Sequence, residues 1–304
     1  MSIVEKAVEK LKNTRPQEPV GLKVAPSAEP GPPYVTSKSS VERLQERISE
    51  THAVAEKTPV WHVDIEALKR VGVLPSEEAA PRLADELRRI KRPLLANITC
   101  NNGAVPVDNG HRIMIASSLP GEGKTFTALN LALSLAMERD FEVLLVDGDA
   151  PKCDLTRLLK LEDRPGLMEV LADEQLQPAN VIVRTDVPNL LVVPVGGRNP
   201  LAAELFSSRR MEYVLREFGG QGRRRLLVFD SPPLLATSEA QVLAPLMGQI
   251  ILVVAAGSTQ QQSVKSAIDT LTGCKCINLI LNRARLPAGE DHYGNYYSRY
   301  YKDR

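Results

Sequence analysis

The sequence is poor in aromatic residues and cysteine, and it has no long hydrophobic run. Aromatic residues make up 4% of the 304 residues, and only one is tryptophan. The four cysteines lack the paired spacing of a zinc site and no secretory leader precedes them, so we expect a reduced, cytoplasmic compartment. No apolar run approaches the roughly 18–20 residues that a membrane-spanning helix needs. Any work at a membrane would therefore depend on another anchor.

The charge balance also argues against one class of partner. The chain has 38 Lys and Arg against 37 Asp and Glu, a net charge of +1. This balance gives no reason to expect nucleic acid as a partner. A hydrophobic content of 43% over this length suits one substantial core with additional material around it.

The most informative segment is residues 113–130, IMIASSLPGEGKTFTALN. A short apolar run, a glycine-containing loop, Lys-Thr and an amphipathic helical pattern follow one another, which is the context of a phosphate-binding loop. Backbone N–H groups of such a loop and the helix N-terminus favour phosphate. We therefore expect ATP and Mg²⁺ as cofactors, although a tight strand-to-helix turn is the alternative. The expected nucleotide contacts are Pro120, Gly121, Glu122, Gly123, Lys124, Thr125 and Phe126.

Two residues of this loop have specific expected roles. Lys124 would reach the β- and γ-phosphates, and the Thr125 hydroxyl would bind Mg²⁺. Ser118 stands where the usual motif has its first glycine.

The regular part of the chain predicts an α/β fold. Continuous apolar runs predict strands at 112–117, 142–147, 189–194, 225–230, 249–255 and 276–282, with helices at 125–138, 200–218, 238–246 and 260–272. Continuous rather than alternating apolar strands indicate a sheet covered on both faces. We expect a doubly wound, mostly parallel sheet of the P-loop NTPase type, with its ligand site at the carboxyl ends of the strands.

Three segments are expected. Residues 1–80 are predicted to be mostly disordered or linker with short helices, including a small ordered element at 64–73. Residues 81–286 would form the nucleotide-binding domain, and 287–304 a flexible tail. The domain would open with a helix at 82–98, interrupted at Pro93, with an exposed charged face made of Glu86, Arg88, Arg89, Lys91 and Arg92.

Carboxylates follow two further predicted strands. Asp147 and Asp149 end the strand at 142–147, and Asp230 ends the strand at 225–230. An aspartate in this position beside a phosphate loop can direct Mg²⁺, which prefers oxygen ligands. We therefore assign Thr125, Asp147 and Asp230 to the metal. Asp149 precedes Ala-Pro, so capping of a turn is its alternative role.

Together these motifs resemble the bacterial tyrosine kinases, the BY-kinase family. SSLPGEGKT resembles the family's Walker A motif, VLLVDGD its A′ motif and LLVFDSPP its Walker B motif. The detached N-terminal region and the sequence KRPLLAN look most like those of cytosolic autokinases of exosortase-type exopolysaccharide systems. Where the family commonly has an arginine after the A′ motif, this chain has Ala150, Pro151 and Lys152, and Lys152 would supply the charge.

The resemblance implies a protein-tyrosine kinase. Catalysis would rest on Lys124, Asp147, Asp149 and Asp230. Because a phenol has a pKa of about 10, a carboxylate that accepts its proton assists attack, and Asp147 is our first choice. Asn282 resembles the position that contacts adenine in related ATPases, with a simple turn residue as the alternative.

The tail and the first helix of the domain complete the resemblance. The tail would be autophosphorylated in trans, although its tyrosine spacing also suits a stripe packed on the core. The acceptors would be Tyr293, Tyr296, Tyr297, Tyr300 and Tyr301. The helix would assemble a homo-oligomer, such as a ring, through Glu86, Arg88 and Lys91.

The resemblance also implies partners and leaves two rivals open. We expect a separate membrane polysaccharide co-polymerase as activator and a tyrosine phosphatase as opponent, with the chain peripherally associated with the inner face of the membrane through its partner. The rivals are a MinD/ParA-like ATPase and a nucleotide-dependent scaffold of an export complex. The first carries an early signature lysine, where this chain has Leu119 and Pro120.

Overall fold

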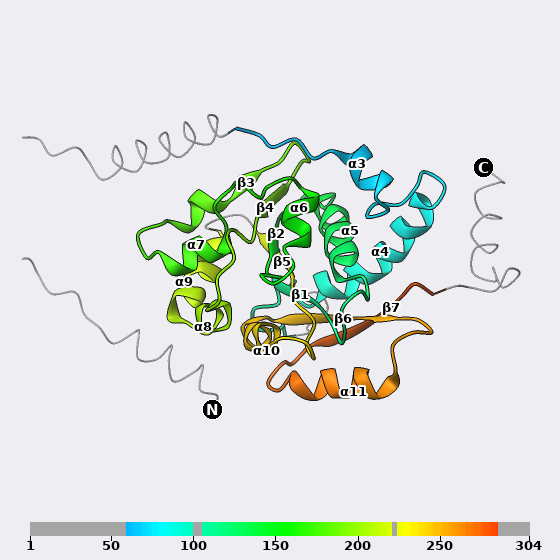
Figure 1. Cartoon of the computed structure of the whole chain (residues 1–304). Coiled ribbons are helices and arrows are strands. Elements are labelled where there is room, and N and C mark those ends of the chain that lie inside the picture. Colours follow the sequence, from blue (N-terminus) through cyan, green and yellow to red (C-terminus); the bar gives the residue numbers. More distant parts are fainter. Residues whose placement is uncertain (1–58, 100–104, 221–223, 285–304) are drawn as a thin grey trace, which may run out of the picture. The chain divides into compact units, whose positions relative to one another are not determined.

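The computed structural model describes residues 59–99, 105–220 and 224–284, and this part of the chain holds a seven-stranded sheet flanked by helices (Figure 1). The strand order is β3-β4-β2-β5-β1-β6-β7, and all neighbours are parallel except β3 and β4. In chain order the strands are β1 (Arg112–Ser117), β2 (Glu142–Asp147), β3 (Val183–Arg184), β4 (Leu190–Val193), β5 (Arg225–Asp230), β6 (Gln249–Ala255) and β7 (Ile277–Asn282).

The sequence predicted six of these strands. β1, β2, β5 and β6 have the predicted bounds, while β4 and β7 are slightly shorter. The two-residue strand β3 was not predicted, because its pairing with β4 comes from tertiary contact rather than from a local apolar pattern. The doubly wound, mostly parallel fold is confirmed.

Helices cover both faces of the sheet (Figure 1). Residues on alternate sides of each strand enter two separate cores, as the pleat requires. In β1, for example, Ile113 and Ile115 face one core and Met114 and Ala116 the other. One core is covered by α3 (Ile65–Arg70), α4 (Ala80–Ala96), α5 (Lys124–Ala136) and α6 (Asp154–Leu158). The other is covered by α7 (Leu167–Ala172), α8 (Ala202–Phe206), α9 (Arg209–Phe218), α10 (Ser238–Leu243) and α11 (Gln261–Thr270), with short 3₁₀ turns η2 (Pro178–Val181) and η3 (Ala244–Leu246).

Helix bounds differ from the prediction where helices are short. The single helix predicted at 200–218 is two helices, because Ser208 caps α9 by accepting a hydrogen bond from the Met211 amide. Helices α6 and α7 were not predicted. They have five and six residues, too few for a clear helical period.

The predicted break at Pro93 is wrong, because α4 runs through this residue. Proline removes one backbone hydrogen bond, but Leu87 and Leu94 bury the helix against the core on either side of it. The prediction that Lys91 is exposed is also wrong. Its ammonium group forms an ion pair with Glu138 at 2.7 Å and donates to the Ser134 carbonyl at 2.9 Å.

The compact unit begins earlier than the predicted boundary at residue 81. Among the described residues it includes the chain from Pro59 onward. Val63, Leu68 and Leu74 are buried in the core beneath α4 and α5, and α3 confirms the small ordered element. The first 58 residues and the tail at 285–304 lie outside the described residues, as do the five predicted acceptor tyrosines.

Within the three described ranges, no helix combines the length and hydropathy that crossing a bilayer requires.

Candidate active site at the carboxyl edge of the sheet

The phosphate loop connects β1 to α5, and its conformation depends on two glycines. Gly121 and Gly123 have φ angles of +82° and +101°, in the left-handed region that favours glycine. A side chain at position 123 would also clash, because a Cβ atom there would lie 2.1 Å from the Asn282 side-chain nitrogen. α5 then begins at Lys124, so its N-terminus points its free N–H groups at the loop.

The Glu122 side chain holds the loop from inside. It is 3% exposed and accepts a hydrogen bond from the Leu119 amide at 2.7 Å. Its other oxygen accepts from the Thr259 hydroxyl, which lies beyond β6. Because both carboxylate oxygens are used inside the protein, a nucleotide contact by Glu122 would come from its backbone.

Asn282, at the end of β7, braces the same loop. Its amide nitrogen donates to the Glu122 carbonyl at 2.9 Å, and its oxygen accepts from the Arg283 amide at 2.8 Å. The contact with adenine stays a prediction. Pro120 is exposed at the tip of the loop, and Phe126 is half-buried in α5.

Two of the predicted carboxylates lie side by side. Asp147 and Asp230 are direct partners in the register of β2 and β5, and both are fully buried. β1 is the next strand, so the phosphate loop leaves the sheet beside Asp230. The parallel arrangement thus gathers Lys124, Asp147, Asp149 and Asp230 at one edge.

The two carboxylates differ in their partners. Asp147 accepts hydrogen bonds from the Thr156 amide at 2.8 Å, the Thr156 hydroxyl at 2.6 Å and the Asp149 amide at 3.1 Å. Both oxygens of Asp230 are buried without a hydrogen-bond partner among the described residues. Polar atoms in this condition are costly unless a ligand satisfies them.

Burial is the largest cause of the pKa shifts of Asp147 and Asp230. It raises the pKa of Asp147 to about 6, against the lowering effect of its Thr156 and Asp149 hydrogen bonds. It raises the pKa of Asp230 well above its usual range, and the charge of Asp147 adds to this. Thr125 and Lys124 act in the opposite direction, although no hydrogen bond of ordinary geometry joins Thr125 to Asp230.

The same groups shift the pKa of Lys124. Burial lowers the pKa of Lys124, while Asp230 and Asp149 raise it. Asp149, whose pKa burial raises, accepts a weak bond from the Lys152 amide at 3.3 Å and feels the Lys152 charge. Asp149 therefore caps its turn and also faces the site.

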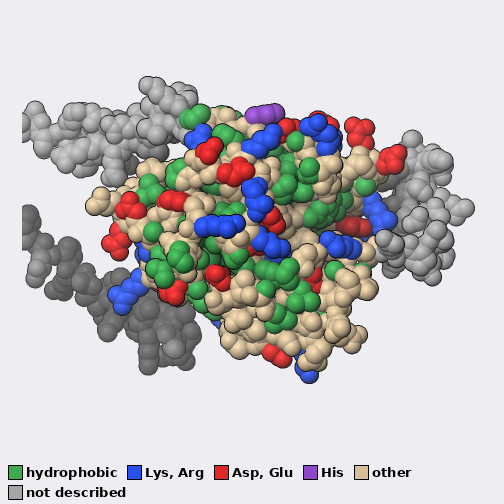
Figure 2. Space-filling view, viewed as in Figure 1, with side chains coloured by type: hydrophobic (Ala, Val, Ile, Leu, Met, Phe, Trp, Pro, Cys, Tyr) green, Lys and Arg blue, Asp and Glu red, His purple; other side chains and the backbone are tan. Residues whose placement is uncertain are grey.

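Figure 2 shows further Lys and Arg side chains gathered around α6, where Arg157, Lys160 and Arg164 are exposed.

The donor set fits Mg²⁺ in company with a nucleotide. In the described ranges, no group of three or more His, Cys, Asp or Glu side chains is arranged to hold a metal by itself. Mg²⁺ usually takes one or two carboxylates and completes its shell with substrate phosphates and waters. The unpartnered oxygens of Asp230 and the adjacent Asp147 suit that role.

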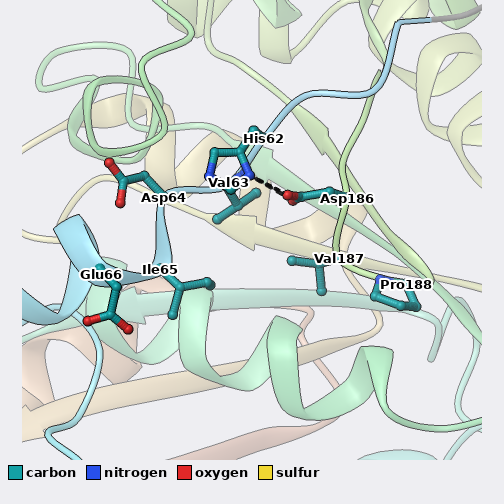
Figure 3. Close-up of a pocket in the computed structure, with 8 residues that line it drawn as sticks. All are labelled: His62, Val63, Asp64, Ile65, Glu66, Asp186, Val187 and Pro188. Atoms are coloured by element: carbon teal, nitrogen blue, oxygen red, sulfur yellow. Dashed lines mark hydrogen bonds and ion pairs between the residues drawn. The ribbon is translucent and has the colours of Figure 1, made fainter.

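A separate cavity of about 370 Å³ lies beside the N-terminal segment (Figure 3). Its acidic groups already have partners. Asp186 pairs with His62 and accepts from the Val63 amide at 3.0 Å. Asp64 caps α3 and pairs with Lys160 at 3.3 Å. The third carboxylate of the lining, Glu66, forms an ion pair with Lys69 at 2.9 Å. These contacts attach the segment to the sheet edge and give each carboxylate of the described lining a partner.

Sequence analysis missed three residues that support the site: Thr156, Thr259 and Trp61. Trp61 pairs with Thr185 at the edge of the sheet, and its indole donates to the Leu159 carbonyl at 2.9 Å. Thr156 reaches Asp147 across 9 residues, while Thr259 and Trp61 reach their partners across 137 and 98. None of these separations follows a helix or strand period, so no local pattern could have identified the three residues.

Comparisons with known proteins agree with this site. No family model matches the chain. The chain is 32% identical over 186 residues to the tyrosine-protein kinase YwqD of Bacillus subtilis, covering 60% of this chain and 76% of YwqD. It is 30% identical over 202 residues to the succinoglycan biosynthesis transport protein ExoP of Rhizobium meliloti, covering 62% of this chain but only 25% of ExoP.

The comparison with solved structures also finds a bacterial tyrosine kinase. The kinase domain of the Escherichia coli tyrosine kinase ETK superposes with a TM-score of 0.59 at 26% identity, covering 68% of this chain and 77% of that one. Sequence, fold and the motifs at the sheet edge agree. The chain belongs to the family of bacterial protein-tyrosine kinases with a P-loop fold.

Proposed function

We propose that this chain is an ATP- and Mg²⁺-dependent protein-tyrosine autokinase that phosphorylates its own C-terminal tyrosine cluster in trans and regulates exopolysaccharide polymerisation or export. The observation that carries this proposal is the meeting of Lys124 and three buried aspartates beside the phosphate loop. These are the groups that phosphoryl transfer needs for positioning and charge stabilisation.

Each residue has a distinct part in the step. The tyrosine oxygen forms a bond to the γ-phosphorus while the bond from that phosphorus to the bridging oxygen breaks, and ADP leaves. The phenol proton passes to Asp147, which is mostly ionised at neutral pH because its pKa is about 6. Lys124 and the loop N–H groups offset the charge that develops on the phosphate oxygens.

The cofactor supplies the phosphoryl group and additional charge neutralisation. Thr125, Asp147 and Asp230 would hold Mg²⁺, and the loop from Pro120 to Phe126 would hold the ATP phosphates. Asp149 would help to position the acceptor or the metal, and Asn282 would lie near adenine.

The proposed acceptors are Tyr293, Tyr296, Tyr297, Tyr300 and Tyr301, which lie outside the described residues. Each phosphate adds about 1.5 to 2 negative charges at pH 7, so several on one short tail repel one another. This repulsion would loosen the docking of the tail and convert a ring into monomers.

Assembly would use the exposed face of α4. Glu86 and Arg88 lie there, in ion pairs with Arg82 and Asp85 of the same helix. Lys91 is committed to Glu138 in its own chain, so Glu86 and Arg88 are the residues to test in an oligomer interface.

The export role rests on relatives such as ExoP, of which this chain spans a quarter. The proposed partners are a membrane polysaccharide co-polymerase that activates the kinase and a tyrosine phosphatase that opposes it. Such a partner would hold the chain at the inner face of the membrane.

Phosphotyrosine mapping by mass spectrometry after incubation with Mg·ATP tests the proposal, with Lys124→Met as the inactive control. Phosphate on the tail in the wild type alone is the expected result. ATP turnover without phosphotyrosine, even with the membrane partner present, would favour the partitioning-type ATPase or the scaffold. Asp147→Asn should bind ATP and lose phosphotyrosine.

A further inference from the structure

Thr156 makes an unusually complete set of hydrogen bonds to one carboxylate oxygen. It is 2% exposed in the short helix α6, and both its amide and its hydroxyl donate to Oδ2 of Asp147, at 2.8 and 2.6 Å. The Val195 amide donates to the same hydroxyl at 2.9 Å. A hydroxyl has one hydrogen, and here it has one donor directed at it and one acceptor facing it. Its orientation is therefore defined.

The two carboxylate oxygens of Asp147 therefore have different hydrogen-bond partners. Oδ2 is held by two donors of one residue, while Oδ1 accepts a single bond among the described residues, from the Asp149 amide at 3.1 Å. Oδ1 thus keeps capacity for a further contact. The adjacent Asp230 has no such support, because neither of its oxygens has a hydrogen-bond partner in the described part of the chain.

We propose that Thr156 is a positioning residue of this kinase, which fixes the Asp147 carboxylate through Oδ2 and presents Oδ1 to the acceptor tyrosine. This proposal rests on the function proposed above and adds a residue outside the A′ motif. It also gives the neighbouring aspartates different parts, with Asp147 held in one orientation and Asp230 open to a ligand.

Tertiary contacts keep Thr156 in place. A five-residue helix is not stable by itself, so α6 needs support at both ends. At its start the Cys153 amide donates to the Asp149 carbonyl at 2.8 Å. At its end the Leu159 carbonyl accepts from the Trp61 indole at 2.9 Å, and Lys160 pairs with Asp64 at 3.3 Å.

The test compares Thr156→Val with Thr156→Ser in the full chain. Valine keeps the shape and removes the hydroxyl, whereas serine keeps the donor and the acceptor. Thr270→Val is the matched control, because the hydrogen bond recorded for Thr270 among the described residues is local, to the Ala267 carbonyl in α11. The measurements are autophosphorylation rate against ATP concentration, ATP affinity by calorimetry, and the thermal unfolding midpoint.

We expect Thr156→Val to lower kcat about 10- to 100-fold, because small misplacements of a reacting group have effects of this size. The Kd for ATP measured without Mg²⁺ should stay within about twofold, since none of the hydrogen bonds that the structure records for Thr156 reaches the phosphate loop. Serine should restore most of kcat, and Thr270→Val should leave it unchanged. A Val variant with normal kcat would overturn the proposal, as would a Ser variant that is no better than Val.

A second readout keeps the proposal separate from the kinase assignment. In a crystal structure of Thr156→Val, the Asp147 side chain should leave its orientation. If wild-type protein makes no phosphotyrosine but Asp147 moves in the variant, the proposed function fails and the positioning role stands. If Asp147 keeps its orientation without the Thr156 hydroxyl, the positioning role is wrong.

Discussion

At the scale of single residues, burial of the active-site carboxylates lowers the stability of the folded protein. Asp147 and Asp230 are buried neighbours, and burial is the largest cause of their raised pKa values. A carboxylate in this situation is disfavoured as an anion until a cation reaches it. The nucleotide-free protein should therefore be less stable at neutral pH than the same fold without these charges.

The first prediction is a pH dependence of stability in the absence of nucleotide and metal. The folded-state pKa of Asp147, about 6, lies above the ordinary value of 3.8, so between these values the native state binds more protons than the unfolded state. Stability from this group therefore rises as pH falls through 6 and is lost above it. From Asp147 alone, the free energy of unfolding should be about 1 kcal/mol larger at pH 5.5 than at pH 7.5.

Urea unfolding at the two pH values measures this change. Asp230→Asn should raise stability at pH 7.5 by on the order of 1 kcal/mol or more, since it removes a buried carboxyl group whose oxygens have no hydrogen-bond partner among the described residues. A destabilised Asp230→Asn protein would contradict the assignment of this carboxylate as a functional group that strains the fold.

The second prediction concerns Gly123. Alanine there would meet both a left-handed φ and the Asn282 side chain at 2.1 Å. Because either the Asn282 side chain must give up its hydrogen bond to the Glu122 carbonyl or the loop must shift, we expect Gly123→Ala to weaken ATP binding at least tenfold. Isothermal calorimetry measures the loss.

Gly257 offers a matched control. Its φ of +70° carries the same conformational strain, but nothing lies within 4 Å of an added Cβ. Gly257→Ala should cost about 1–2 kcal/mol of stability and leave ATP affinity unchanged. Equal losses of affinity in the two variants would show that backbone strain, rather than the contact with Asn282, governs the loop.

At the scale of elements, α4 is attached to α5 by a buried charge. Lys91 is 8% exposed, pairs with Glu138 and donates to the Ser134 carbonyl. The third prediction is that Lys91→Ala lowers the free energy of unfolding by about 1.5–3 kcal/mol, because a hydrogen-bonded buried charge is lost. Arg92→Ala, at the next and exposed position, should change stability by less than about 0.5 kcal/mol.

Denaturant unfolding of the two variants, together with light scattering, separates folding from assembly. If Lys91→Ala kept full stability and only dissolved an oligomer, Lys91 would belong to an interface between subunits after all.

At the scale of the whole molecule, the described part of the compact unit starts at Pro59. The fourth prediction compares two truncations. Removal of residues 1–57 should leave the unfolding midpoint of the kinase domain nearly unchanged. Removal of residues 1–79 deletes the buried side chains of Val63, Leu68 and Leu74, each worth about 1.5–3 kcal/mol, and should unfold or aggregate the domain.

Circular dichroism melts of the two truncated proteins against the full chain make this comparison. Equal midpoints for both truncations would mean that the segment from Trp61 to Leu74 is dispensable, and the predicted boundary at residue 81 would be the correct one.

The sequence alone determined the parts that are local. Apolar runs of six or seven residues predicted six strands, and the motifs that follow β1, β2 and β5 predicted that Lys124, Asp147 and Asp230 would meet. The inference worked because parallel strands bring their carboxyl ends to one edge whatever the helices between them do.

Only the tertiary structure decided how these groups are held. The Lys91 bond to Ser134 spans 43 residues, the Trp61 bond to Leu159 spans 98, and the Asn282 bond to Glu122 spans 160. Thr156 lies only 9 residues from Asp147, but its role is set only when α6 folds back so that its amide and hydroxyl reach the end of β2. Hydrogen bonds between distant segments leave no period in the sequence, because each depends on where the whole sheet places two unrelated stretches of chain.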